Sequence, residues 1–356
     1  MLRKLCLKIT AAELAIYGSA IFFTTLFWIL FYKNNNTEGN FVVYYAKLLI
    51  HSLIGGGEWF LILLGFSVFL YLYAMFFLSL ARGIKPTIYF SRERLRNFIV
   101  VTRAKYLPPL IRFATPLVIS FVLFGLNLSY INSLNASNLR DELLLSSDRA
   151  LTGLYPFIFL GNIHYPKWAV EAVDFSFGSL PLFFAVFLIY LLFTKKDLFL
   201  EAATAFTMSL LVSLPFWIMI PAMSPHDRFI DNIYNLEINS ETQKAIATYQ
   251  PQAELRKFLE KIRESKNRLG NNAPTTTFPS AHIEWALLFA YYGFWSDKRL
   301  LFAILPLAIL SSFGTIFFAQ HYFVDIPAGV VIGAIAITIA KLLRQLAGYK
   351  IVRLTD

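Results

Sequence analysis

The chain turns at Gln320-His321-Tyr322-Phe323-Val324-Asp325, a short segment that separates two long apolar runs. A second histidine stands upstream in Phe278-Pro279-Ser280-Ala281-His282, where another apolar run begins. Apolar runs of about 20 residues are typical of membrane-spanning helices. Each segment therefore lies where a predicted span meets its polar edge. We expect the two histidines and Asp325 to gather at one rim of a membrane.

The composition indicates a multi-pass membrane protein. Of the 356 residues, 57% are hydrophobic and only 15% are charged, with a mean hydropathy of +0.58, which excludes an ordinary soluble domain. The net charge of +10 does not indicate a nucleic-acid partner, because the basic residues stand in short segments between apolar runs. The single cysteine, Cys6, excludes an internal disulfide and a cysteine-based metal cluster.

Working outward from the two histidines, the sequence predicts an all-α polytopic membrane bundle of eight spans. The amino-terminal run is longer than the core of a signal peptide, so we interpret it as a retained span. The polar segment 223–277 is predicted to be an outer loop that contains an amphipathic helix at 241–266. The expected spans are about 11–32, 59–81, 113–131, 173–193, 198–222, 279–295, 300–319 and a last one from 326.

The basic clusters fix the predicted orientation. With eight spans they all fall on one side, the strongest at 82–112, and basic loops mark the cytoplasmic side. His282 and His321 then both face the opposite side. The predicted location is an integral membrane protein with its site on the non-cytoplasmic face of a bacterial plasma membrane or a secretory-pathway membrane.

The residue types at this rim suit phosphoryl transfer. A carboxylate four residues after His321 can orient its imidazole and leave the other ring nitrogen as a nucleophile. His282 can act as general acid and base, while Ser280 and the amides at the start of its helix, including that of Ala281, can bind a phosphoryl group. A zinc site would need three close ligands, so neither metal nor cofactor is predicted. The alternative is that both histidines are interfacial residues with satisfied hydrogen bonds.

At these positions the sequence resembles the type 2 phosphatidic acid phosphatase superfamily. Within it, the closer resemblance is to the inositol phosphorylceramide synthases and, more distantly, the sphingomyelin synthases. The family motif Pro-Ser-x-His is matched at 279–282 and the motif His-x-x-x-Asp at 321–325. The resemblance implies that His321 is the nucleophile, Asp325 orients it, His282 is the general acid and base, and Ser280 binds the phosphoryl oxygens.

The resemblance also implies a domain organisation. A catalytic core of six helices is expected at 113–356, with 223–277 as its outer loop. Residues 1–112 would be an added region with two spans and a basic cytoplasmic loop. A segment at 148–153 resembles one that precedes the second core helix in the synthase branch, and it is expected to shape the outer rim.

Two departures from the phosphatase pattern concern positive charge. The phosphatases carry an arginine six residues before the nucleophile, where this chain has Thr315, and the chain has no Arg-Pro dipeptide. Arg228 is the predicted replacement cation for the phosphate. Its alternative is an ordinary interfacial arginine paired with Asp227 or Asp231. The missing basic residues favour transfer between lipids over simple hydrolysis.

The sequence thus predicts an enzyme that moves a phosphoryl or phospho-headgroup unit from a lipid phosphate or phospholipid donor, with a lipid alcohol as a possible acceptor. The first alternative is a phosphatase acting on phosphatidic acid or a polyprenyl phosphate. The second is a non-catalytic transporter or scaffold. A transporter is expected to show repeats or paired broken helices, and only 55–57 offers a break. Glu284, an acid within a predicted span, is left outside the predicted site.

Overall fold

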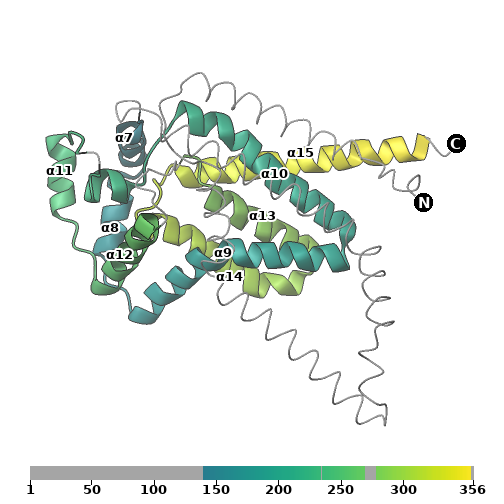
Figure 1. Ribbon diagram of the computed structural model, residues 1–356, viewed down its shortest axis with the longest axis horizontal. Coiled ribbons are helices and arrows are strands. Elements are labelled where there is room, and N and C mark those ends of the chain that lie inside the picture. The colour runs from purple at the N-terminus through teal and green to yellow at the C-terminus, as the bar shows by residue number, and fades with distance from the viewer. Residues whose placement is uncertain (1–138, 234, 269–277, 354–356) are drawn as a thin grey trace, which may run out of the picture. The chain divides into compact units, whose positions relative to one another are not determined.

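The computed structural model describes residues 139–353, apart from 234 and 269–277, and within these ranges the chain has no strand (Figure 1). The prediction of an all-α membrane bundle is confirmed. In chain order, the helices are α7 (Asp141–Thr152), α8 (Pro156–Asn162), α9 (Lys167–Thr194), α10 (Lys196–Met219), the π-helix η3 (His226–Ile230), α11 (Ser240–Ala247), α12 (Ala253–Arg268), α13 (Ala281–Ser296), the 3₁₀ turn η4 (Lys298–Leu300), α14 (Leu301–Phe317) and α15 (Asp325–Arg353).

Four segments of the described chain are long and apolar enough to cross a membrane: Lys167–Thr194, Asp197–Met219, Lys298–Phe317 and Asp325–Gln345. They correspond to the fourth, fifth, seventh and eighth predicted spans. The sixth is α13, whose 16 residues extend only about 24 Å. The first three predicted spans lie outside the described residues. The count of eight and the boundary at 112/113 therefore stay predictions.

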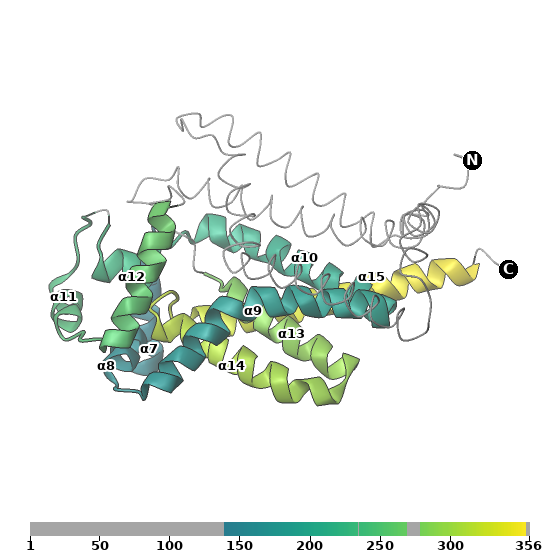
Figure 2. The ribbon, with the colours of Figure 1, turned by 60° about the horizontal axis from the view of Figure 1, so that its bottom comes forward.

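The membrane helices pack around α13. This helix contacts α9, α10, α14 and α15, while α10 also lies along α15 and α9 along α14 (Figure 2). One close approach requires a glycine. A Cβ atom at Gly329 of α15 would lie 2.8 Å from the carbonyl oxygen of Ser280 and 2.9 Å from Cβ of Ile283. The first turns of α13 and α15 are thus held together, and these turns carry the predicted site residues.

Shorter helices pack against one end of α14. Leu144 of α7, Phe157 of α8 and Phe229 of η3 share a buried apolar core with Ile316 and Tyr322. A second core joins α9 and α12 to the end of α14, through Val170, Leu255, Leu259, Phe317 and Phe318. The end of α14 and Tyr322 of the 320–325 loop are therefore buried beneath these helices, which fixes the position of the loop.

The structure corrects one predicted helix. The amphipathic helix expected over 241–266 is two helices, α11 and α12, separated at 248–252. Pro251 lies in this connection, and proline has no backbone N–H with which to continue a helical hydrogen-bond pattern. Tyr249 therefore lies between the helices, whereas Leu255 and Leu259 are buried on α12 as their spacing predicts.

Candidate active site

The imidazole of His321 is held by Asp325. Its Nδ1 atom lies 3.0 Å from Oδ2 of Asp325, and the same oxygen accepts the backbone N–H of Tyr322 at 3.0 Å. The Asp325 side chain is buried and that of His321 is 11% exposed. A carboxylate on Nδ1 favours the tautomer whose lone pair is on Nε2. The arrangement therefore directs Nε2 of His321 away from Asp325, ready to react.

Ser280 faces this second nitrogen. Its Oγ lies 3.2 Å from Nε2 of His321. Ser280 is also the N-cap residue of α13, and its side chain makes no capping hydrogen bond. A serine at this position ordinarily accepts an amide hydrogen bond from the first helical turn. Because Ser280 points to His321 instead, no side chain caps the first amides of α13, which favour an anion.

His282 stands across from His321. The centroids of the two rings are 6.2 Å apart. The ring of His282 stacks on Phe177 of α9, with centroids 4.5 Å apart and planes at 4°. The wall of α9 thus fixes the plane of this imidazole. The two imidazoles are therefore neighbours, one on the first turn of α13 and the other in the 320–325 loop.

The 320–325 loop is fixed at its start by the end of α14. The carbonyl oxygen of Thr315 accepts the backbone N–H groups of Gln320 and His321, both at 3.0 Å. The Thr315 hydroxyl donates to the carbonyl of Ser312 at 2.7 Å. The residue that replaces the expected arginine is therefore buried and bonded to its own helix, and it supplies no positive charge.

Asp148 of α7 is a site residue whose role the sequence did not indicate. Its Oδ2 accepts the N–H of Phe323 at 2.8 Å, and its Oδ1 accepts that of Val324 at 2.9 Å. Burial raises the pKa of Asp148 to about 6, an effect that the two amides oppose and the nearby charge of Asp325 increases. The segment 148–153, predicted to shape the outer rim, thus contributes a direct support of the loop.

Asp141 lies two helical turns before Asp148. It holds the segment that contains Met223 as well as the 320–325 loop. Its Oδ1 accepts both the hydroxyl of Tyr322 at 2.9 Å and the N–H of Met223 at 2.8 Å. Burial is the main cause that raises the pKa of Asp141 to about 7, and burial also raises the pKa of Tyr322 well above its usual range. A pattern was present in the sequence: acids at 141 and 148 stand on the same helical face as the buried pair Leu144 and Leu145.

Arg228, the predicted phosphate cation, is buried at 5% exposure in η3. Its Nη2 atom donates to the carbonyl oxygen of Glu237 at 2.9 Å and lies 3.4 Å from Oε1 of Glu142. The guanidinium also lies 4.8 Å from the ring centroid of Phe229. Its acidic partner is thus Glu142, where the sequence alternative named Asp227 or Asp231. Nη1 is buried without a hydrogen-bond partner among the described residues.

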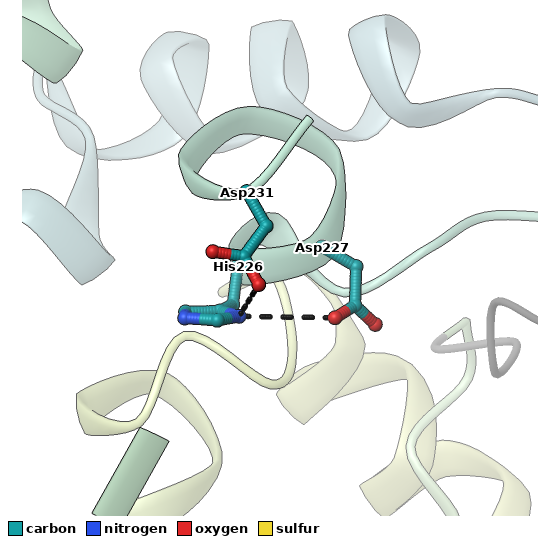
Figure 3. A group of neighbouring side chains, drawn as sticks. All are labelled: His226, Asp227 and Asp231. Atoms are coloured by element: carbon teal, nitrogen blue, oxygen red, sulfur yellow. Dashed lines mark ion pairs between the residues drawn. The ribbon is translucent and has the colours of Figure 1, made fainter. Parts of the chain in front are cut away.

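A group of potential metal ligands adjoins the loop. Nδ1 of His226 lies 3.7 Å from a carboxylate oxygen of Asp227 and 3.7 Å from one of Asp231 (Figure 3). The three ligand atoms lie within 4.8 Å of one another. Atoms that share a metal at about 2.0–2.2 Å lie no more than about 4.4 Å apart, a limit that the two 3.7 Å separations from His226 meet. A protonated imidazole between two carboxylates satisfies the same geometry. His226 is tied to the catalytic end because its N–H donates to the carbonyl of Ala319 at 2.9 Å.

Glu284 lies one turn inside α13 and is fully buried. The hydroxyl of Ser213 on α10 donates to its Oε1 at 2.5 Å. The described side-chain hydrogen bond of Glu284 is therefore made with α10.

The family of the chain can now be stated. The structure brings Ser280, His282, His321 and Asp325 together from two parts of the sequence, and the model of the PAP2 superfamily matches residues 143–339. No curated protein and no solved structure gives a significant match. The matched region is more than half of the chain and contains both histidine motifs. The chain therefore belongs to the PAP2 superfamily, a family of lipid phosphatase and phosphotransferase type enzymes, and it is an integral membrane enzyme of this type.

Proposed function

We propose that this enzyme transfers a phosphoryl or phospho-headgroup unit between two lipids through a covalent phosphohistidine at His321, as in an inositol phosphorylceramide synthase. The observation that supports it best is the bonding of His321. Asp325 accepts from Nδ1, while Nε2 faces Ser280 and the ring of His282. An imidazole bonded in this way is a nucleophile with a preset direction of attack.

In the first half-reaction, Nε2 of His321 attacks the phosphorus of the donor lipid. The P–N bond forms as the P–O bond to the leaving group breaks, and protonated His282 gives its proton to the departing oxygen. The carboxylate of Asp325 stabilises the positive charge that develops on the His321 ring. Ser280 and the amides that open α13 donate to the phosphoryl oxygens.

In the second half-reaction, the hydroxyl of a lipid alcohol attacks the same phosphorus. His282, now neutral, takes the hydroxyl proton, and the P–N bond breaks. Both histidines return to their initial states, so the cycle is balanced in atoms, charge and protons. Water in place of the alcohol would give hydrolysis by the same steps. Thr315 and the absence of an Arg-Pro dipeptide support an alcohol over water as the acceptor.

Orientation in the membrane is also part of the proposal. Basic residues gather at the helix ends remote from His321, namely Lys195, Lys298, Arg299, Lys341 and Arg344. Basic ends are retained in the cytoplasm. We therefore infer a multi-pass protein with the site on the non-cytoplasmic face. Arg228 is the proposed cation for the donor phosphate, because its buried Nη1 has no hydrogen-bond partner among the described residues. Residues 113–356 would form the catalytic core.

The test is a transfer assay with purified protein in lipid vesicles. A phospholipid donor labelled in its phosphate is incubated with and without ceramide, for the wild type, His321→Ala and His164→Ala. His164 is an exposed histidine outside the site and serves as the matched control. We expect label on the lipid alcohol with the wild type and His164→Ala, and none with His321→Ala. Label released as free phosphate would show hydrolysis instead, and equal activity of His321→Ala would remove the proposed nucleophile.

The covalent intermediate can be tested separately. Brief incubation of the wild type with labelled donor alone should leave label on the protein that is stable in alkali and lost in acid, as expected for a phosphoramidate bond. His321→Ala should carry none. Label that resists acid, or that persists in His321→Ala, would contradict a phosphohistidine at this position.

A further inference from the structure

A cavity lies at the end of the bundle remote from His321. It has a volume of about 640 Å³. Its lining residues belong to the junction of α9 and α10, the last turns of α13 and the second half of α15, elements that are labelled in Figure 1. Lys341 in its wall stands 16 residues after Asp325, which is about 24 Å along α15. The cavity is therefore separate from the histidine site, and it would lie at the opposite membrane surface.

Two acids of this cavity share one arginine. Arg344 contacts Oε2 of Glu201 at 2.7 Å and Oδ2 of Asp197 at 3.9 Å. Glu201 is buried at 6% side-chain exposure, so its ion pair is screened less than that of exposed Asp197. Arg344 offsets one of the two negative charges. With Lys195 and Lys341, the lining has three cations against two acids and a net charge of +1.

Two lysines supply charge that is not balanced in this way. Lys195 Nζ donates to the backbone carbonyl of Ser296, and Lys341 Nζ lies 4.9 Å from the ring centroid of Tyr291. Neither ammonium has a carboxylate within ion-pair distance among the described residues. The carbonyl and the ring hold the two ammonium groups in place without cancelling their charge. The cavity wall is therefore cationic on balance.

The surroundings indicate a position at the level of lipid head groups. Trp295, which also lines the cavity, is 57% exposed, and tryptophan is enriched where the apolar core of a membrane meets water. Basic pockets between membrane helices are suited to anionic head groups. The volume lies in the range of small-molecule sites and exceeds what a free phosphate ion fills.

We propose that this cavity binds the head group of an anionic phospholipid, with the ammonium groups of Lys195 and Lys341 contacting its phosphate. A lipid head group and a free phosphate ion present the same phosphate anion to the two lysines. The volume of the cavity and the exposed Trp295 assign the ligand to a lipid. The inference does not depend on the proposed reaction, since the cavity contains neither histidine of the active site.

The test is lipid binding to the full-length, delipidated protein in detergent, measured by native mass spectrometry. The probes are phosphatidylglycerol, which is anionic, and phosphatidylcholine, which is zwitterionic. At about 1 kcal/mol per lysine, we expect Lys341→Gln to weaken phosphatidylglycerol binding about fivefold and Lys195→Gln/Lys341→Gln about 25-fold. Binding of phosphatidylcholine should change little. The single variant Lys341→Gln keeps the hydrogen bond between Lys195 and Ser296. It therefore tests the proposal even if the double variant fails to fold.

The matched control is Lys298→Gln/Arg299→Gln, which removes two positive charges at the same end of the bundle from residues that do not line the cavity. Retained phosphatidylglycerol binding in this variant supports a defined site. An equal loss in both double variants would indicate diffuse attraction and overturn the proposal, as would no loss in either. Inorganic phosphate at about 10 mM should leave the lipid bound, and displacement by phosphate would overturn the assignment to a lipid.

Discussion

The carboxylate of Asp148 accepts the backbone N–H of Phe323 at 2.8 Å, and its other oxygen accepts that of the following residue at 2.9 Å. These amides lie between His321 and Asp325 in the chain. The pairing of the imidazole with its carboxylate therefore depends on a residue of α7, far away in the sequence. Asp148 is a positioning residue, and the ionisation of Asp148 is coupled to the geometry of the site.

We expect Asp148→Asn to lower kcat about tenfold or more with little change in KM. The amide side chain has only one oxygen to accept two N–H donors, so one buried backbone N–H loses its partner. Because the pKa of Asp148 is raised to about 6, the wild type should lose activity as pH falls through 6. The acid limb of the pH profile should be flattened in Asp148→Asn. The exposed Asp297→Asn is the control, and an unchanged acid limb in Asp148→Asn would contradict the coupling.

Activity is expected to fall at low pH, whereas the free energy of unfolding should be larger there. A carboxyl group whose pKa is higher in the folded than in the unfolded protein holds its proton more tightly when folded. Asp148 and Asp141, with pKa values raised to about 6 and about 7, therefore favour the folded state most at low pH. This contribution is lost as pH rises from about 4 to 7. Thermal unfolding across this interval, for the wild type and Asp148→Asn, should show a smaller dependence on pH in the variant.

Asp325→Asn should reduce activity on the order of 10³-fold while leaving the fold intact. The amide oxygen can still accept the N–H of Tyr322, but the neutral group no longer stabilises positive charge on His321. Formation of the labelled phosphoenzyme should slow to the same degree as turnover. A variant that keeps more than a tenth of wild-type activity would show that the carboxylate is not required.

Tyr322→Phe should lower the free energy of unfolding by about 1–3 kcal/mol, because buried Asp141 loses the hydroxyl that donates to it at 2.9 Å. Tyr292→Phe is the matched control, since this tyrosine is equally buried but its hydroxyl reaches its acceptor only at 3.4 Å. Thermal unfolding of both variants in detergent measures the difference. Equal midpoints for the two would indicate that the bond to Asp141 contributes little.

Gly329→Ala should impair both stability and turnover. The new Cβ would lie 2.8 Å from the carbonyl oxygen of Ser280, so α15 or the start of α13 must move, at a cost of about 1–3 kcal/mol. Ser280 would then leave its position 3.2 Å from Nε2 of His321. Gly178→Ala in α9 is the control, because its Cβ would have no neighbour within 4 Å. Equal activity of the two variants would argue against the close approach.

Much of this architecture could be predicted because helices that cross a membrane need long runs of apolar residues. Long apolar runs locate α9, α10, α14 and α15, and histidines at the ends of such runs locate the rim. The spacing of His321 and Asp325 predicts their contact, which the structure contains. The pattern says less where the helices are short and partly polar. There, Pro251 separates α11 from α12, although the apolar spacing continues across the interruption.

The partners of the supporting residues could not be predicted. The spacing of Asp141 and Asp148 places them on the apolar face of their helix, but a sequence does not show which loop covers that face. Their partners are backbone amides and a tyrosine hydroxyl more than 80 residues away. Arg228 is similar, since its hydrogen bonds to Glu142 and to the Glu237 carbonyl depend on how η3 packs.

The contact between α7 and the 320–325 loop joins residues that are far apart in the sequence, which has a consequence for biosynthesis. Asp148 and Phe323 are separated by 175 residues, and a ribosome adds about 5–20 residues per second. Asp148 is therefore made roughly 9–35 s before the amide that it will bind. During that interval α9, α10, α13 and α14 are synthesised, while His321 and Asp325 do not yet exist. On the proposed mechanism, the nascent chain is inert towards the surrounding lipids until α15 is begun.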